Sequence, residues 1–297
     1  SRPGPVWGYH SRRLFASREK PMTASAPAWL ADPTRLLEPE QVSLSATTLL
    51  VHVSSAAAYA AAHLPGAVLV EPGELVAGVP PAPGRLPDLG RLTALFGRIG
   101  YQPDQDIVVY DDEGGGWAGR FLWTLDVIGH RQHSLLNGGL HSWLKEGHPI
   151  ASEVPSIIPT SVSVTIQDEP IAEIDTILAT LADPTVKIWD ARSSEEYLGL
   201  RAGSMRNGHI PGAVNLDWVD VMDPARNLRL LPLAVIRDKL RSLGINDDDS
   251  IITHCQSHHR SGLTYMVAKL LGHRAKGYHG SWGEWGNNPD VPIESVA

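Results

Sequence analysis

The two halves of this 297-residue chain carry the same short motifs in the same order. The matching runs are 63–67 with 209–213, 129–131 with 272–274, and 137–143 with 279–285. Ordered self-similarity of this kind is the signature of a duplicated structural unit. Because each half is long enough to bury its own core, we predict two tandem domains of one architecture.

Composition along the chain predicts where the two units begin and end. Residues 1–27 contain several Arg and Lys but lack the apolar core of a secretory signal, so we expect a leader that is either non-native or a flexible native arm. The N-terminal domain is expected over 28–151 and the C-terminal domain over 170–297. Between them, residues 152–169 contain Pro, Ser and Thr without helical periodicity, which predicts an extended linker.

Each half alternates short apolar strands with helical patterns. This alternation predicts an α/β fold, with two tandem domains that are each a mainly parallel sheet covered by helices. The expected strands are 48–53, 107–111 and 134–136 in the first half, and 187–191, 251–255 and 275–278 in the second. In such sheets ligands bind beyond the carboxyl ends of the strands.

Charge and apolar content exclude several classes of function. The formal net charge is −8 without a long basic run, so neither nucleic acid nor an anionic membrane surface is an expected partner. No apolar run approaches the roughly 20 residues that a membrane helix needs. One cysteine cannot form an intramolecular disulfide, and a cytoplasmic location is therefore expected.

The only cysteine, Cys255, stands where an apolar strand runs into a helix. Apolar residues between 263 and 271 have the spacing of one buried helical face, so the loop 256–261 should lie at the helix N-terminus. Free N–H groups and the helix dipole favour an anion there. Such surroundings lower the pKa of a thiol, and we predict a reactive thiolate.

Two other interpretations of Cys255 are weaker. An unpaired cysteine is often a small buried hydrophobe, but the neighbours here are polar and cationic, as around reactive cysteines. A zinc site from His254, Cys255, His258 and His259 is the second alternative. It lacks a second cysteine and matches no usual zinc spacing, so no metal is expected.

The first half lacks the nucleophile. Carrying the alignment back from the Gly-His-Arg runs without a gap places Asp112 opposite Cys255 and Trp117 opposite Arg260. The loop 111–117 is acidic and glycine-rich, so it would repel an anion. We expect a degenerate copy of the active loop, with a calcium or phosphate site as the alternative.

Taken together, these features resemble the two-domain rhodaneses, the thiosulfate:cyanide sulfurtransferases, over about residues 28–297. The motifs that carry the resemblance are the repeat, Asp-Ala-Arg at 190–192, His-Ile-Pro-Gly-Ala at 209–213, the cysteine loop, and Gly-Ser-Trp-Gly-Glu-Trp at 280–285. The loop Cys-Gln-Ser-His-His-Arg is most similar to a bacterial type with Thr in third position. It differs from the Cys-Gly-Ser/Thr-Gly-Val-Thr loop of mercaptopyruvate sulfurtransferases. Glu196 stands where animal rhodaneses place an arginine that contacts substrate.

The resemblance implies a sulfur-transfer cycle at Cys255 that needs no metal or organic cofactor. The partners implied are thiosulfate as donor and cyanide, a small thiol or a protein thiol as acceptor. Four residues separate Cys255 from Arg260, one fewer than in phosphatases of this fold, which argues against phosphatase chemistry. A persulfide carrier or redox-interaction protein is the alternative from another class.

Roles for the loop and its supports follow from the same resemblance. The substrate-binding residues expected through their backbone N–H groups are Gln256, Ser257, His258, His259 and Arg260. The supporting residues expected are Asp190, Arg192 and Ser261.

Several of these residues have two open interpretations. Asp190 is expected to hydrogen-bond the active loop or to cap a helix, and Arg192 to form an interdomain salt bridge or to contact substrate. His258 and His259 either titrate near neutral pH or are exposed loop residues without a role. Arg260 shapes the loop and adds positive potential, or pairs with a carboxylate.

Two further regions are assigned by their composition. Trp282 and Trp285 are expected to pack in the core, with a position beside Cys255 as the lesser alternative. The insertion 201–206 is expected to be a solvated surface loop, with anion steering by its two arginines as the other interpretation.

Overall fold

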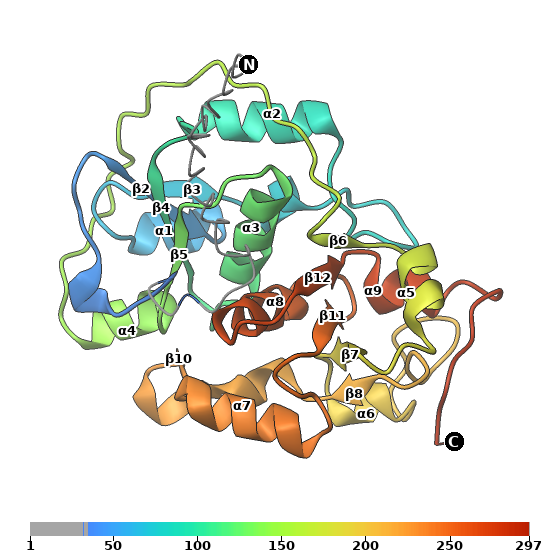
Figure 1. Cartoon of the computed structure of the whole chain (residues 1–297). Coiled ribbons are helices and arrows are strands. Elements are labelled where there is room, and N and C mark those ends of the chain that lie inside the picture. Colours follow the sequence, from blue (N-terminus) through green and yellow to red (C-terminus); the bar gives the residue numbers. More distant parts are fainter. Residues whose placement is uncertain (1–31, 33–34, 297) are drawn as a thin grey trace, which may run out of the picture.

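The computed structural model describes residue 32 and residues 35–296, so the expected leader 1–27 lies outside the described residues. Each half contains a five-stranded sheet in which all paired strands are parallel, flanked by helices (Figure 1). The predicted α/β fold with two tandem domains is confirmed. Among the described residues, no helix is both long and apolar enough to cross a membrane.

The first sheet has the strand order β1-β5-β4-β2-β3. Its strands are β1 (Leu36–Leu37), β2 (Thr48–Val53), β3 (Val68–Val70), β4 (Asp106–Asp111) and β5 (His133–Leu136). The helices of this half are α1 (Ala56–Ala61), α2 (Leu89–Arg98), α3 (Gly116–Val127) and α4 (Gly139–Lys145), with 3-10 turns η2 (Pro39–Gln41) and η3 (Pro72–Leu75).

The second sheet has the equivalent order, β6-β12-β11-β7-β8. Its strands are β6 (Ile171–Ala172), β7 (Val186–Asp190), β8 (Val214–Asn215), β11 (Ser250–His254) and β12 (Ala275–Tyr278). The helices are α5 (Ile174–Thr180), α6 (Ser194–Tyr197), α7 (Leu233–Ser242), α8 (Arg260–Leu270) and α9 (Ser281–Trp285). An antiparallel pair, β9 (Met222–Asp223) and β10 (Arg229–Leu230), and the 3-10 turns η4 (Trp218–Val221) and η5 (Pro224–Arg226) lie between β8 and α7.

The sequence repeat is also a repeat of contacts. In the first half the His63 ring stacks on Tyr59 at 3.9 Å, and its Nδ1 lies 2.7 Å from the Tyr59 carbonyl. His209 and Tyr197 do the same in the second half, at 3.8 and 2.8 Å. Each tyrosine hydroxyl donates to the carbonyl of the alanine that ends its motif, at 2.7 Å in both halves. The matched motifs therefore build the same corner twice.

Residues 152–169 contain neither helix nor strand. They run along the first half, where Ile157 and Val162 pack against its core and the Thr160 N–H donates to the Gly97 carbonyl at 3.0 Å. This segment is therefore packed against the first half along part of its length, and the borders of the two domains stay a prediction.

The two halves share one hydrophobic core. Helices α3 and α8 pack against each other in the middle of the molecule (Figure 1). Phe121 and Trp123 of α3 belong to the same buried cluster as Leu263 and Met266 of α8. Because the active loop leads into α8, the interface between the halves lies directly beside it.

Candidate active site

The candidate active loop joins the middle strand of the second sheet to the helix at the domain interface. The strand β11 ends at His254 and α8 begins at Arg260, so Cys255 stands at the carboxyl end of a central parallel strand. His258 has a left-handed backbone with φ of 56°, which turns the chain into the helix. The Cys255 side chain is only 1% exposed.

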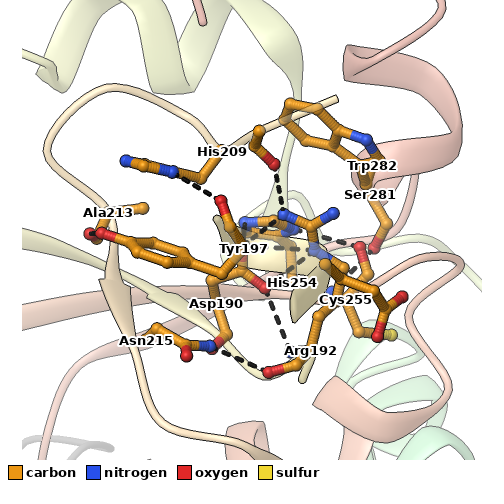
Figure 2. A network of polar contacts seen from close by, with 12 residues as sticks. Asp190, Arg192, Tyr197, His209, Ala213, Asn215, His254, Cys255, Ser281 and Trp282 are labelled. Atoms are coloured by element: carbon orange, nitrogen blue, oxygen red, sulfur yellow. Dashed lines mark hydrogen bonds and ion pairs between the residues drawn. The ribbon is translucent and has the colours of Figure 1, made fainter. Parts of the chain in front are cut away.

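Helix α9 holds the start of this loop from one side. The Cys255 N–H donates to the Ser281 hydroxyl at 3.3 Å, and the Cys255 carbonyl accepts from the Trp282 N–H at 2.9 Å (Figure 2). The Gln256 carbonyl accepts from the Gly283 N–H at 2.9 Å. Within residues 35–296, no acceptor pairs with the backbone N–H groups of residues 256–259. These donors are therefore available to an anion beside the sulfur.

The surroundings of the sulfur favour its anionic form. Burial by itself raises the pKa of Cys255, but the positive charge of Arg260 and hydrogen bonds from the Ser261 hydroxyl and backbone lower it, and His259 adds to this effect. The net pKa lies below its ordinary value. A lowered pKa favours the nucleophilic thiolate, and the reactive thiolate stays a prediction.

Arg260 is held by a carboxylate from α6. Its two terminal nitrogens donate to the two oxygens of Glu196, at 2.7 and 2.9 Å. Although burial raises the pKa of Glu196, this pairing and hydrogen bonds from Ser193 lower it to about 2. Both groups are therefore charged at neutral pH. Of the two interpretations of Arg260, the carboxylate pair is the one that the structure contains.

The two loop histidines are not exposed. His258 is fully buried, with Nδ1 2.7 Å from the Ser261 hydroxyl and its ring edge-on to Trp123 at 4.6 Å. Burial, with Arg120 and other histidines nearby, lowers the pKa of His258 well below 6.5. The expectation that His258 titrates near neutral pH, or is an exposed residue, is wrong because the ring lies inside the interface.

His259 points toward the first half. Its Nε2 contacts the Glu113 carboxylate, and its ring stacks on Trp117 at 4.3 Å. Both partners belong to the degenerate loop and the start of α3. His259 is therefore half-buried and in contact with the first half, and not exposed as one interpretation had it, while its role stays a prediction.

Asp190 and Arg192 form a buried ion pair within the second half. Arg192 Nη2 donates to Asp190 Oδ2 at 2.6 Å and to the Gly208 carbonyl at 2.8 Å. The Arg192 guanidinium lies over the Trp282 ring, 4.5 Å from its centroid (Figure 2). The proposed interdomain salt bridge of Arg192 is wrong, because its carboxylate partner is two residues away in sequence. Its guanidinium is 1% exposed, which leaves the alternative substrate contact without an open face.

The Asp190 carboxylate supports the loop only indirectly. Across the described part of the chain its hydrogen bonds all go to Arg192, and His254 Nε2 lies 3.6 Å away. The expected direct hydrogen bond to the active loop is therefore wrong. The cap alternative is also wrong, since Ser193 caps α6.

The insertion 201–206 packs against the active loop. Gln256 Nε2 donates to the Gly203 carbonyl at 2.8 Å, and the Ser204 hydroxyl donates to the Trp282 carbonyl at 3.0 Å. Arg206 donates to the Trp285 carbonyl at 3.1 Å. This segment is therefore anchored, and the prediction of a solvated loop holds only for its exposed side chains. Trp282 and Trp285 are buried in the core of this half, as predicted.

In the degenerate loop of the first half, backbone N–H groups bind the carboxylate of Asp111. In the active loop the corresponding kind of donor has no partner. Asp111 accepts from the N–H groups of Glu113, Gly115 and Ala118 at 3.1, 2.8 and 2.9 Å. A cavity of only about 10 Å³ remains beside it, lined by leucines from the second half. Three of the N–H groups that could bind a phosphate are therefore already occupied, and the calcium or phosphate alternative stays a prediction.

Residues of the first half also reach the active loop, and no sequence motif points to them. A Cβ placed on Gly84 would lie 2.0 Å from the Ser257 carbonyl oxygen, so the two backbones touch. Arg120 Nη1 donates to the His258 carbonyl at 3.4 Å. In the sequence, only the alignment of the degenerate loop with the active loop hinted at such contacts.

Comparison with known proteins agrees with this architecture. Residues 36–146 and 173–288 match the rhodanese-like domain family, and the chain belongs to that family. It is 52% identical over 256 residues to a thiosulfate sulfurtransferase of Azotobacter vinelandii, covering 86% of this chain and 94% of the relative. A thiosulfate sulfurtransferase of Pseudomonas aeruginosa is 50% identical over 247 residues, 83% of this chain and 90% of the relative. The resemblance to two-domain rhodaneses is confirmed.

Two more distant comparisons complete this set. The sulfur carrier protein TtuD of Thermus thermophilus is 35% identical over 213 residues, 67% of this chain and 74% of the relative. Among solved structures, EanB in complex with ergothioneine superimposes with a TM-score of 0.78 at 22% identity, covering 89% of this chain and 70% of that one. At this identity the match shows the shared fold alone.

Proposed function

We propose that this protein is a thiosulfate sulfurtransferase in which Cys255 carries the transferred sulfur. One observation carries the proposal. The only cysteine is buried in the loop that leads into α8, and the pKa of its thiol is lowered there. Two relatives that are 52% and 50% identical to this chain are named thiosulfate sulfurtransferases. Each alignment covers most of both sequences. This degree of similarity supports thiosulfate as the sulfur donor of this protein as well.

The proposed reaction has two displacement steps. The Cys255 thiolate attacks the outer sulfur of thiosulfate, the sulfur–sulfur bond of thiosulfate breaks, and sulfite leaves with the electron pair. The enzyme then carries a persulfide. Cyanide or a thiol attacks the outer sulfur of this persulfide, and the thiolate returns. We assign no separate general base to this step, because the lowered pKa of Cys255 favours the thiolate.

The loop supplies the stabilisation of charge in both steps. Backbone N–H groups from Gln256 to Arg260 are proposed to hold the outer sulfur, as preorganised dipoles hold developing charge in other sites. Ser261 lowers the pKa of the Cys255 sulfur. Arg260 fixes the loop through Glu196, and the pair Asp190–Arg192 stiffens the end of β7 beside it.

A sulfur carrier is the second candidate, and the similarity to TtuD favours it. A carrier must present its persulfide to a partner protein, whereas Cys255 is 1% exposed. This burial favours a small donor and acceptor over direct protein docking.

We also propose a reducing cytoplasmic location, since the mechanism needs Cys255 as a free thiolate. The domain borders proposed are 28–151 and 170–297.

The test is thiocyanate formation from thiosulfate and cyanide, with Cys255→Ser beside the native protein. Parallel lines in a two-substrate kinetic analysis and loss of turnover in the variant are expected. An aryl phosphate serves as the control for phosphatase chemistry. Failure of the native protein to form thiocyanate, together with stoichiometric persulfide transfer to a protein thiol, would instead support the carrier.

A further inference from the structure

Arg120 of α3 is a buried cation in the half that has no cysteine. Its side chain is fully buried, its Nη2 donates to the Leu75 carbonyl at 2.7 Å, and the guanidinium lies over the Trp123 ring at 4.7 Å. Its Nε has no hydrogen-bond partner within the part of the chain that the structure describes. Among the described residues no carboxylate lies within ion-pair distance of it. An unpaired buried charge is costly, so an opposite charge is required nearby.

The position of Arg120 links it to the active loop. A Cβ placed on Gly262 of α8 would lie 2.4 Å from the Arg120 backbone nitrogen, so the two helices touch at this point. Arg120 Nη1 also donates to the carbonyl of His258, within the loop that begins at Cys255. The guanidinium therefore reaches across the interface to the loop that surrounds the sulfur.

The other arginines around Cys255 each contact a carboxylate, and so does His259. Arg260 is paired with Glu196, with Asp217 also acting on it, and His259 contacts Glu113. Arg192 is paired with Asp190. Among the described residues Arg120 is thus the arginine beside the loop without a carboxylate at ion-pair distance, while Arg260 acts on the sulfur in spite of its pairing.

The buried histidines supply no charge at neutral pH. Burial lowers the pKa of both His254 and His258 below the ordinary value. For Arg120, burial likewise lowers the pKa to about 9, and the charge of the Cys255 thiolate is what raises it. The Cys255 thiolate therefore acts on Arg120 as it does on Arg260, and Arg120 differs in having no carboxylate beside it.

We infer that Arg120, supplied by the half without a cysteine, is a positioning residue that acts together with Arg260 to balance the negative charge of the Cys255 sulfur. The inference rests on the thiolate of the proposed function. It gives the degenerate domain a part in the chemistry of the active one. Because a persulfide is also an anion, the same counter-charge serves both halves of the cycle.

Alkylation of Cys255 by iodoacetamide across a range of pH tests this inference. The chain has one cysteine, so the rate reports its ionisation without interference. Arg120→Gln is expected to raise the apparent pKa by about one unit, a tenfold loss of thiolate below that pKa. Arg120→Lys keeps the charge and is expected to restore most of the native value. The native pKa in a folded Arg120→Gln protein would overturn the inference.

A matched control separates charge from packing. Arg229 is another interface arginine, bound to Glu38 and Glu146 at the end of the interface that holds the degenerate loop. Arg229→Gln is expected to leave the pKa of Cys255 unchanged, whereas an equal rise in both variants would show a general effect of loosening the interface. A rise in Arg120→Lys as large as in Arg120→Gln would also contradict the role of charge.

A second variant keeps the test open if Arg120→Gln does not fold. Glu196→Gln leaves Arg260 without its carboxylate and is expected to lower the pKa of Cys255 further. No change in this variant would mean that Glu196 does not weaken the effect of Arg260 on the sulfur, so Arg260 alone would supply the counter-charge and the role of Arg120 would be overturned. Thiocyanate formation by the native protein is measured alongside. Its absence would sink the proposed function, while the alkylation data would still decide the role of Arg120.

Discussion

Gly119 and Gly262 occupy equivalent positions in the two halves of the chain, and their backbones touch where α3 meets α8. A Cβ on Gly119 would lie 2.3 Å from the carbonyl carbon of Gly262, closer than real side chains come to backbone. This contact brings the two helices together at the first turn of α8. The active loop and the degenerate loop therefore face each other across one close packing point.

Gly119→Ala is expected to destabilise the protein. In an exposed helix this change stabilises by up to about 1 kcal/mol, but overpacking here costs about 1–3 kcal/mol. Urea unfolding measures the net effect. Gly73→Ala is the control, because a Cβ on Gly73 meets nothing within 4 Å. Equal midpoints for the two variants would contradict the close contact.

Gly84→Ala is expected to reduce turnover more than stability. The added methyl would force the Ser257 carbonyl to move, and with it the N–H groups beside Cys255. A shift of this kind in a preorganised site lowers kcat by about tenfold or more. The measurement is thiocyanate formation, again beside Gly73→Ala. Turnover within twofold of native would show that the loop is not set by this contact.

The pair of Glu196 and Arg260 predicts part of the acid sensitivity. The pKa of Glu196 is lowered to about 2 in the folded protein, so its contribution is present above about pH 4.5 and lost as pH falls through 2. The shift corresponds to at most about 3 kcal/mol at neutral pH, and solvent screening of the partly exposed pair reduces this figure. Glu196→Gln should therefore be less stable than native at pH 7, with the difference shrinking by pH 3. Urea midpoints at both pH values decide this, and a constant difference contradicts it.

Asp126 of α3 is a buried carboxylate that joins the halves. It accepts from the Tyr265 hydroxyl at 2.8 Å and from Lys269 Nζ at 2.5 Å in α8, and it lies 2.9 Å from His133 Nε2. Asp126→Asn removes one partner of a buried pair, which costs about 3–5 kcal/mol. Arg131→Gln, which removes a partly exposed partner of the same carboxylate, should cost about 1 kcal/mol or less. Similar losses in thermal unfolding for both would contradict the assignment.

His258 is expected to stay neutral through the physiological range. The pKa of His258 is well below 6.5 because the ring is buried. As pH falls below about 6.5, the unfolded chain binds a proton that the folded protein does not, so the folded state loses stability. Histidine NMR from pH 8 to 5 measures this directly. A midpoint near 6.5 for His258 would show that the ring reaches solvent.

The sequence by itself determined the duplicated α/β architecture and the position of the reactive thiol. Local patterns carry both: motif spacing reveals the repeat, and the apolar strand before Cys255 with the helical spacing after it places the loop at a helix N-terminus. The absence of a cysteine in the first half likewise predicted that its loop is degenerate. Each of these signals lies within a short stretch of chain.

Only the tertiary structure decided which side chains surround that loop. Arg120, Glu113 and Gly84 lie far from Cys255 in sequence, and no local pattern distinguishes them from ordinary interface residues. The same holds for the partners of Arg192 and Arg260, which sequence reasoning left open. Charges in a low-dielectric interior pair with whatever the fold brings near. Their partners are therefore set by how the two halves pack, and not by the order of residues along the chain.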